Sequence, residues 1–247
     1  MEANSQFGKL EVVPAYKLVF DAIEKQIVSR KLKEGDLLPP ELALAEQLGV
    51  NRSTVREGIR LLEESGLVTR LGGKRLRVRL PDPLDSAPQV QRALVLNQVT
   101  FREMWEAANA LEPIMAGLAA QRITDEELQE LEANLAQLEA SPADVALFMK
   151  VDIAFHDAIG RAARNRPLLM ARESVSSLLM PAGHAILPKL KSHKRVIDAH
   201  REILNALRER DASAAEHWMR RHIADFKRGY ERAGFDADSI LQRADTR

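Results

Sequence analysis

The chain of 247 residues contains no cysteine, so disulfide bonds are excluded and any metal site must use nitrogen and oxygen ligands. It has no apolar run close to the roughly 20 residues that a membrane-crossing helix needs. Its N-terminal sequence lacks the basic start and the apolar core of a signal peptide. These absences predict a cytoplasmic protein that has no membrane partner.

The chain also has no net charge, since 36 basic residues balance 36 acidic ones. The distribution of the charges is uneven, however. Residues 51–79 hold eight basic side chains and only three acidic ones, so the rest of the chain carries a matching acidic excess. A basic module attached to an acidic body is a pattern that suits a nucleic-acid partner for the module alone.

The N-terminal third shows the periodicity of three short helices, over residues 14–30, 41–49 and 51–66. The period then changes, and residues 67–80 alternate apolar with basic side chains around a Gly-Gly pair, as a β-hairpin does. Three helices followed by a basic hairpin predict a winged helix-turn-helix, which is a DNA-binding domain.

The third of these helices carries arginines and hydroxyls near its N-terminal end, the end that meets base edges in this motif. Arg52 and Arg56 lie about 40° apart around the helix axis, so both can face one groove. The arginine spacing by itself also suits a solvated basic face, but the order of the surrounding elements favours DNA. The predicted DNA-binding residues, including two in the hairpin, are Arg52, Ser53, Thr54, Arg56, Lys74 and Arg75.

A segment with three prolines, residues 81–88, shows no apolar periodicity and is interpreted as a linker. The predicted division is a DNA-binding domain over 1–80, a linker over 81–90, an all-α domain over 91–235 and a tail over 236–247. Beyond the linker every segment has helical periodicity. We expect a bundle with helices over 94–121, 124–139, 143–164, 167–185, 194–209 and 211–231.

The predicted bundle contains a D-x-x-x-H pair, Asp152 and His156, which one helical turn places on the same face about 6 Å apart. His200 and His222 fall in the last two helices, which can bring both to one point. Three imidazoles and a carboxylate suit Zn, Ni, Mn, Co or Fe. A D-x-x-x-H pair is also common as a helix cap or as a buried hydrogen-bonded pair. The predicted metal ligands are Asp152, His156, His200 and His222.

The stretch "LPPELALAEQLGVNRSTVREGIRLLEESGLV" resembles the DNA-binding domain of the GntR superfamily of bacterial transcription regulators, and the resemblance covers residues 12–80. It implies that Arg52, Ser53, Thr54 and Arg56 contact operator DNA. The family usually has an arginine where this chain has Leu42. That departure implies a missing contact from the second helix and a different operator preference.

Residues 91–231 resemble the FCD ligand-binding domain of the FadR subgroup, through "DIAFHDAI", "RNRPLL", "AHREILNAL" and "AAEHWMRRHI". In metal-containing members the residues matching the aspartate and three histidines bind a divalent ion at the base of a pocket. A small carboxylate effector can coordinate that ion. The family typically has an arginine that helps to hold the effector where this chain has Ala108, which puts the usual anionic effectors in doubt.

The expected function is therefore that of a ligand-responsive, sequence-specific transcription regulator, not an enzyme. It would act as a homodimeric repressor on double-stranded operator DNA and would sense a small organic acid such as a sugar acid or hydroxy acid. Two alternatives stay open. The metal could be purely structural, or the chain could be a metal-dependent hydrolase with a DNA-binding head, although the sequence places no obvious general base beside the metal pair.

Overall fold

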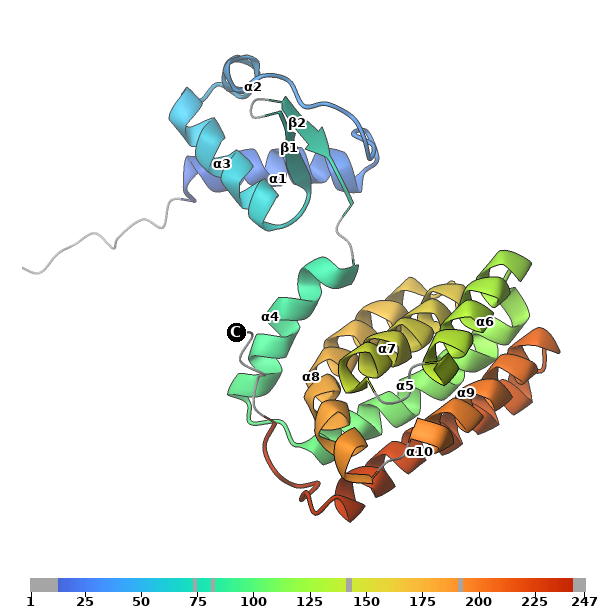
Figure 1. The fold of residues 1–247 in the computed structure, drawn as a ribbon. Helices are drawn as coiled ribbons and strands as arrows, with labels where there is room; N and C mark the ends of the chain where they lie inside the picture. Colours follow the sequence, from blue (N-terminus) through green and yellow to red (C-terminus); the bar gives the residue numbers. More distant parts are fainter. Residues whose placement is uncertain (1–12, 73–74, 81–82, 141–143, 191–192, 242–247) are drawn as a thin grey trace, which may run out of the picture. The chain divides into compact units, whose positions relative to one another are not determined.

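The structure is a computed structural model that describes residues 13–72, 75–80, 83–140, 144–190 and 193–241. The chain divides into two compact units, Met1–Asp85 and Ser86–Arg247. Figure 1 shows short helices with a two-stranded hairpin in the first unit and long helices in the second. The mainly α fold expected from the sequence, with its wing and its helical C-terminal part, is confirmed.

The N-terminal unit has the element order of a winged helix-turn-helix. Its hairpin is antiparallel, with Val68 opposite Val78 and Leu71 opposite Arg75. In the third helix Val55, Ile59 and Leu62 are completely buried, as its periodicity predicts, and they pack against apolar residues of the first helix and the hairpin. The elements are α1 Ala15–Val28, α2 Glu41–Leu48, α3 Arg52–Glu64, β1 Val68–Leu71 and β2 Arg75–Val78.

The turn between α2 and α3 is fixed by two residues. Gly49 ends α2 in the left-handed conformation with φ at 67°, which a residue without a Cβ adopts at no steric cost. Asn51 then caps α3, and its side-chain oxygen accepts a hydrogen bond from the Thr54 backbone N–H at 3.0 Å. The abrupt start of α3 therefore follows from a glycine stop and an asparagine cap only two residues apart.

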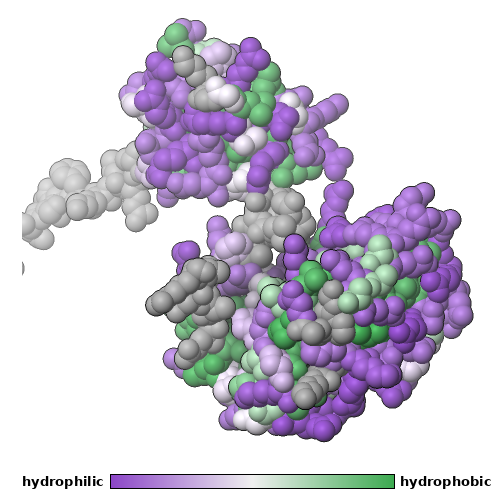
Figure 2. All heavy atoms as spheres, viewed as in Figure 1, coloured by the Kyte–Doolittle hydropathy of each residue, from purple (hydrophilic) through white to green (hydrophobic). Residues whose placement is uncertain are grey.

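The C-terminal unit is a bundle built around α5, which contacts α7, α8, α9 and α10. Apolar side chains fill its interior, while the faces visible in Figure 2 are largely hydrophilic. No helix in the described part of the chain is long and apolar enough to cross a membrane. The helices are α4 Pro83–Leu96, α5 Phe101–Arg122, α6 Asp125–Ala140, α7 Val145–Ala162, α8 Arg166–Leu190, α9 His193–Arg208 and α10 Ala212–Arg232.

The beginning of this unit differs from the sequence prediction. The proline-rich segment interpreted as a linker is helical from Pro83 onward. The single helix expected over 94–121 is instead two helices, α4 and α5, separated by a turn in which Gln98 has a φ of 55°. Thr100 starts α5 with a capping box, in which its side chain and that of Glu103 each bond to the other's backbone N–H.

The structure also differs from the sequence prediction at the end of helix α8 and in the segment that follows α10. Helix α8 continues through Pro181 and Pro188 to Leu190, beyond the predicted end at residue 185. The segment after α10, predicted to be a tail, packs on the bundle as far as it is described. There the Leu241 backbone N–H donates to the Val99 carbonyl at 2.9 Å, and Ala237 is buried. In α8, the contacts of buried apolar side chains outweigh the loss of the backbone hydrogen bond that each of its two internal prolines removes.

Candidate metal centre and nucleic-acid interface

The exposed N-terminal end of α3 carries four of the six predicted DNA-binding residues. The side chains of Arg52 and Arg56 are 61% and 58% exposed, so both guanidiniums are accessible to a ligand. The hydroxyls of Ser53 and Thr54 both donate to the side-chain oxygen of Asn51, at 2.8 and 2.6 Å. This end of α3 therefore combines two accessible cations with two hydroxyls held beside the helix cap.

Glu41 organises the two arginines, and sequence reasoning missed it. Its carboxylate accepts hydrogen bonds from Arg52 Nε at 3.0 Å and from Arg56 Nη2 at 3.3 Å. Burial alone would raise the pKa of Glu41, but these two guanidiniums outweigh it and hold the pKa below its usual value. In the sequence, an acidic residue in the first turn of α2 is explained by the helix dipole alone. The sequence therefore gives no sign of its contact with α3.

The wing presents further basic side chains. Arg75 and Arg77 are exposed on β2, while the side chains between and after them are buried in the unit's core. Lys74, the other predicted wing residue, lies outside the described residues. Arg60 lies beyond the tip of α3 and pairs with Glu57 and Glu64 of its own helix, at 3.3 and 2.6 Å. Exposed arginines thus lie both at the start of α3 and on β2.

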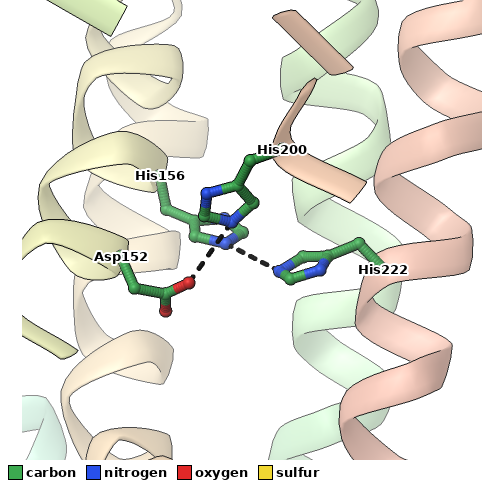
Figure 3. Close-up of side chains that lie close together, drawn as sticks. All are labelled: Asp152, His156, His200 and His222. Atoms are coloured by element: carbon green, nitrogen blue, oxygen red, sulfur yellow. Dashed lines mark hydrogen bonds and ion pairs between the residues drawn. The ribbon is translucent and has the colours of Figure 1, made fainter. Parts of the chain in front are cut away.

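In the C-terminal unit, three helices bring the four predicted metal ligands together (Figure 3). Asp152 and His156 come from α7, His200 from α9 and His222 from α10, and one ligand atom from each lies within 4.8 Å of all the others. His156 Nε2 is 3.2 Å from His222 Nε2, and His200 Nε2 is 3.2 Å from Asp152 Oδ1. The other three histidines, His184, His193 and His217, lie outside this group.

The donor atoms of the cluster suit a divalent cation. Neither nitrogen of the fully buried His200 ring has a hydrogen-bond partner among the described residues, and Nε2 lies 3.2 Å from the Asp152 carboxylate. Zinc–nitrogen bonds are about 2.0–2.1 Å long, so ligands on opposite sides of one ion lie about 4 Å apart. Small side-chain rotations would therefore let all four residues bind one ion. Phe155 stacks on the His200 ring at 4.0 Å and fixes its plane.

The charges at the cluster also favour a cation. Burial lowers the pKa of His200, and burial together with neighbouring His200 and His156 lowers the pKa of His222 to about 3. The pKa of Asp152 lies below its ordinary value, since its histidine neighbours outweigh the effect of burial. At neutral pH the cluster thus offers an ionised carboxylate and two neutral imidazoles, the protonation states that metal binding requires.

A buried carboxylate, Glu112, orients the remaining histidine. Glu112 Oε2 lies 3.2 Å from His156 Nδ1, and Glu112 Oε1 accepts a hydrogen bond from Arg172 Nε at 2.7 Å. Burial raises the pKa of Glu112, but Arg172 and His156 outweigh it and lower that pKa to about 2. In turn, Glu112 raises the pKa of His156 against the effect of burial. A proton on Nδ1 leaves Nε2 facing the cluster, as carboxylate–histidine–metal triads do.

Neither Glu112 nor Arg172 was identified from the sequence, although Glu112 stands in the motif where the Ala108 departure was noted. Arg172 is 2% exposed and also donates to Asp157 at 2.7 Å. The carboxylates of Glu112 and Asp157 therefore both bond to the Arg172 guanidinium. Neither is positioned as the free general base that a hydrolase would need.

A cavity of about 240 Å³ adjoins the cluster. Asp152, His156 and His222 line it, and so does Ala108, the position where the resembling family has an arginine. The cavity thus joins three of the four candidate metal ligands to a space that a small molecule can enter.

Comparison with known proteins places both units in one family of regulators. Residues 15–78 match the model of the bacterial regulatory proteins of the gntR family, and residues 103–225 match the FCD domain. A transcriptional regulator of Bacillus subtilis, LutR, is 30% identical over 204 residues, which cover 81% of this chain and 93% of LutR. The chain belongs to the GntR family. It is a transcription regulator of the FCD-containing type.

Other relatives are similar over most of this chain and over most of their own length. The Glc operon transcriptional activator of Escherichia coli K12 is 27% identical over 242 residues, which cover 94% of each chain. The galactonate operon transcriptional repressor of the same strain is 29% identical over 202 residues, or 78% of this chain and 86% of the repressor. These relatives are transcription regulators, which confirms the expectation that the chain is not an enzyme and sets the hydrolase alternative aside.

The fold agrees with a solved GntR structure. The GntR protein of Streptococcus agalactiae has 26% sequence identity, covers 86% of this chain and 99% of its own, and superposes with a TM-score of 0.60. The two proteins therefore share a fold over most of this chain.

Proposed function

We propose that this GntR-family protein is a homodimeric, cytoplasmic repressor whose operator binding is controlled by a small carboxylate effector. The effector would bind a divalent metal ion held by Asp152, His156, His200 and His222. The single observation that carries this proposal is the convergence of those four side chains from three helices, three of which, Asp152, His156 and His222, also line a cavity in the FCD domain.

The output of the proposed regulator is the N-terminal end of α3. Arginine forks match the paired acceptors of guanine, and hydroxyls bond to phosphates or bases. The two arginines are accessible but tied to Glu41, which keeps both guanidiniums on one side of the helix. Arg75 on β2 would contact the DNA backbone. Two copies related by a two-fold axis would read two operator half-sites.

The input is the histidine cluster. Three imidazoles and one carboxylate suit zinc, nickel, manganese, cobalt or iron, and a six-coordinate ion would keep two positions for an effector's oxygens. The buried triad from Arg172 through Glu112 to His156 would hold one ligand ready for the ion. An effector then controls DNA binding only if it favours one arrangement of the two DNA-binding units over another.

Complete burial of His200 also supports a second role, in which the metal only holds α7, α9 and α10 together. The two roles differ in what happens when one ligand is lost. A structural ion stabilises the fold by its whole binding free energy, whereas a sensing ion contributes chiefly to the response.

The test uses His156→Ala, with His217→Ala as the control because His217 is an exposed histidine on α10. Fluorescence anisotropy would measure the affinity of each full-length variant for an operator selected from a random duplex library, with and without metal and a panel of organic acids. We expect His156→Ala to keep operator affinity within about threefold and to lose the acid response. Equal losses of folding and operator binding in this variant, with a normal control, would instead indicate a structural metal.

A second pair of variants tests the output. Arg56→Ala should weaken operator binding by about 1–3 kcal/mol and relax its sequence preference. Arg60→Ala should change it by less than about 0.5 kcal/mol, because Arg60 lies beyond the tip of α3 and pairs with two glutamates of its own helix. Wild-type affinity in Arg56→Ala would reject α3 as the recognition helix.

A further inference from the structure

The wall of the cavity is divided between a polar end and a long apolar side. The polar groups near the metal cluster are Asp152, His156 and His222, with the Glu112–Arg172 pair behind them. Most of the other lining side chains are apolar. They come from α5, α7, α8, α9 and α10, and include Met149, Leu179, Leu187, Val196, Ile223 and Phe226.

The remaining charged residues of the lining lie where it reaches solvent. Arg195 and Arg232 are exposed, and Arg195 lies 3.9 Å from Asp225, its ion-pair partner. These cations can attract an anion to the opening, but they are not enclosed with a bound ligand. A molecule inside the cavity would therefore meet one polar end, at the cluster, and apolar walls elsewhere.

This wall is poorly suited to a sugar acid or hydroxy acid, the effectors expected from the sequence. Each hydroxyl that enters an apolar site without a partner loses its hydrogen bonds to water. Ser176 is the only lining residue with a side-chain hydroxyl among the described residues, and Ala108 stands where the family has an arginine. A polyhydroxylated chain would consequently leave most of its hydroxyls unpaired.

The volume limits the size of the part of the ligand that the cavity encloses, because the cavity also opens to solvent. At roughly 30 Å³ for each water-sized group, a cavity of about 240 Å³ holds about eight non-hydrogen atoms. Hexanoate has this size, whereas a six-carbon sugar acid has about five more atoms. Lactate is small enough to enter, but its single methyl group would leave most of the apolar wall without contacts.

We propose that the effector is an apolar monocarboxylic acid of about eight non-hydrogen atoms, with its carboxylate at the metal cluster and its hydrocarbon part against the apolar wall. The proposal rests on the proposed function, because the carboxylate end requires the metal. It narrows the class of ligand, from small organic acids in general to acids with an unsubstituted alkyl or aryl part.

The test is calorimetric titration of the full-length protein, loaded with one equivalent of Zn²⁺, with acetate, butanoate, hexanoate, octanoate, lactate and gluconate. Burial of each added methylene should tighten binding about fourfold, so hexanoate should bind on the order of 200-fold more tightly than acetate. Binding should stop improving near octanoate, when the cavity is full. Lactate and gluconate should bind more weakly than hexanoate.

A change in the cavity itself provides a matched measurement. Gly229 lines the cavity on α10, and a methyl group there would lie 3.4 Å from Ile186 and 3.5 Å from Leu190, which are ordinary contacts. Alanine also favours the helix, so Gly229→Ala should fold. The added methyl group occupies about the volume of one methylene, and the best-binding acid should become about one carbon shorter.

The outcomes separate this inference from the proposed function. If lactate or gluconate binds the zinc-loaded protein more tightly than hexanoate does, or the series shows no dependence on length, the apolar class is overturned while metal-dependent sensing stands. If hexanoate binds equally with and without zinc, the apolar class stands and the role of the metal is overturned. If none of the six acids binds, both proposals fail.

Discussion

Arg172→Met is the substitution with the largest effect that the site predicts. The Arg172 side chain is 3% exposed and bonds to Glu112 at 2.7 Å, to Asp157 at 2.7 Å and to Glu173 at 3.3 Å. Methionine keeps much of the length and the apolar stem of the side chain but removes the cation. The carboxylate of Glu112, itself only 7% exposed, would then be buried without its main counter-charge.

The size of the expected loss of stability depends on which of the three carboxylates stays buried after the arginine is removed. Removing one member of a buried ion pair typically destabilises a protein by about 3–5 kcal/mol, because the remaining charge loses both its partner and its water. Asp157 and Glu173 are more exposed and add little. The matched control is Arg161→Met, since the Arg161–Glu130 pair is more than half exposed on both sides, and we expect a loss of at most about 1 kcal/mol.

Urea unfolding of the metal-free protein, followed by tryptophan fluorescence, measures both changes. The chain's two tryptophans, Trp105 and Trp218, lie in α5 and α10, so the signal reports the C-terminal unit alone. Glu112→Gln in the Arg172→Met background should restore part of the lost stability, because the orphaned charge is gone. If Arg172→Met lies within about 1 kcal/mol of the Arg161→Met control, the buried triad does not have the energetic role assigned to it.

Three further predictions concern metal binding, the helix cap and the wing. Between pH 5 and 7.5, metal affinity measured by chelator competition should fall about tenfold per pH unit below the pKa of His156. Glu112 raises that pKa, whereas burial lowers the pKa values of His200 and His222, so one proton competes with the ion. A pH dependence of metal affinity that corresponds to three competing protons would contradict the assignment of a single proton to His156. Asn51→Ala removes the oxygen that caps α3 and should lower the melting stability of the N-terminal unit by about 1–2 kcal/mol, and an unchanged thermal transition would reject the cap. Arg75→Ala should weaken binding similarly for all duplex sequences and reduce the salt slope of log K by about one, while loss at a single base position would indicate a base contact.

The parts of the molecule that the sequence predicted depend on local patterns. Val55, Ile59 and Leu62 recur at helical spacing, and their burial follows directly from that period. The pairing of Asp152 with His156 is equally local, because one helical turn separates them. The predicted helices of the bundle were recognised in the same way, and their errors are at the ends, where caps and tertiary contacts decide.

The unpredicted parts depend on contacts between segments far apart in the sequence. Glu112 and Arg172 are separated by 60 residues, and the periodicity of each helix would place a charged residue in solvent. Glu41 likewise has the appearance of a helix-start residue until α2 and α3 are packed together. The convergence of His200 and His222 on Asp152 was expected only on the assumption of antiparallel neighbours and a family resemblance. The break between α4 and α5 was not predicted, although "TFRE" is a capping sequence.

Operator affinity measured under four conditions tests the central claim most directly. The full-length protein would be titrated into a fluorescently labelled operator without additions, with Zn²⁺, with hexanoate, and with both. We expect only the combination to change the dissociation constant, by about fivefold or more, because the acid binds through the ion and coupling free energies between sites are typically about 1–3 kcal/mol. The same dissociation constant in all four conditions, or a response to the acid without metal, would contradict this expectation.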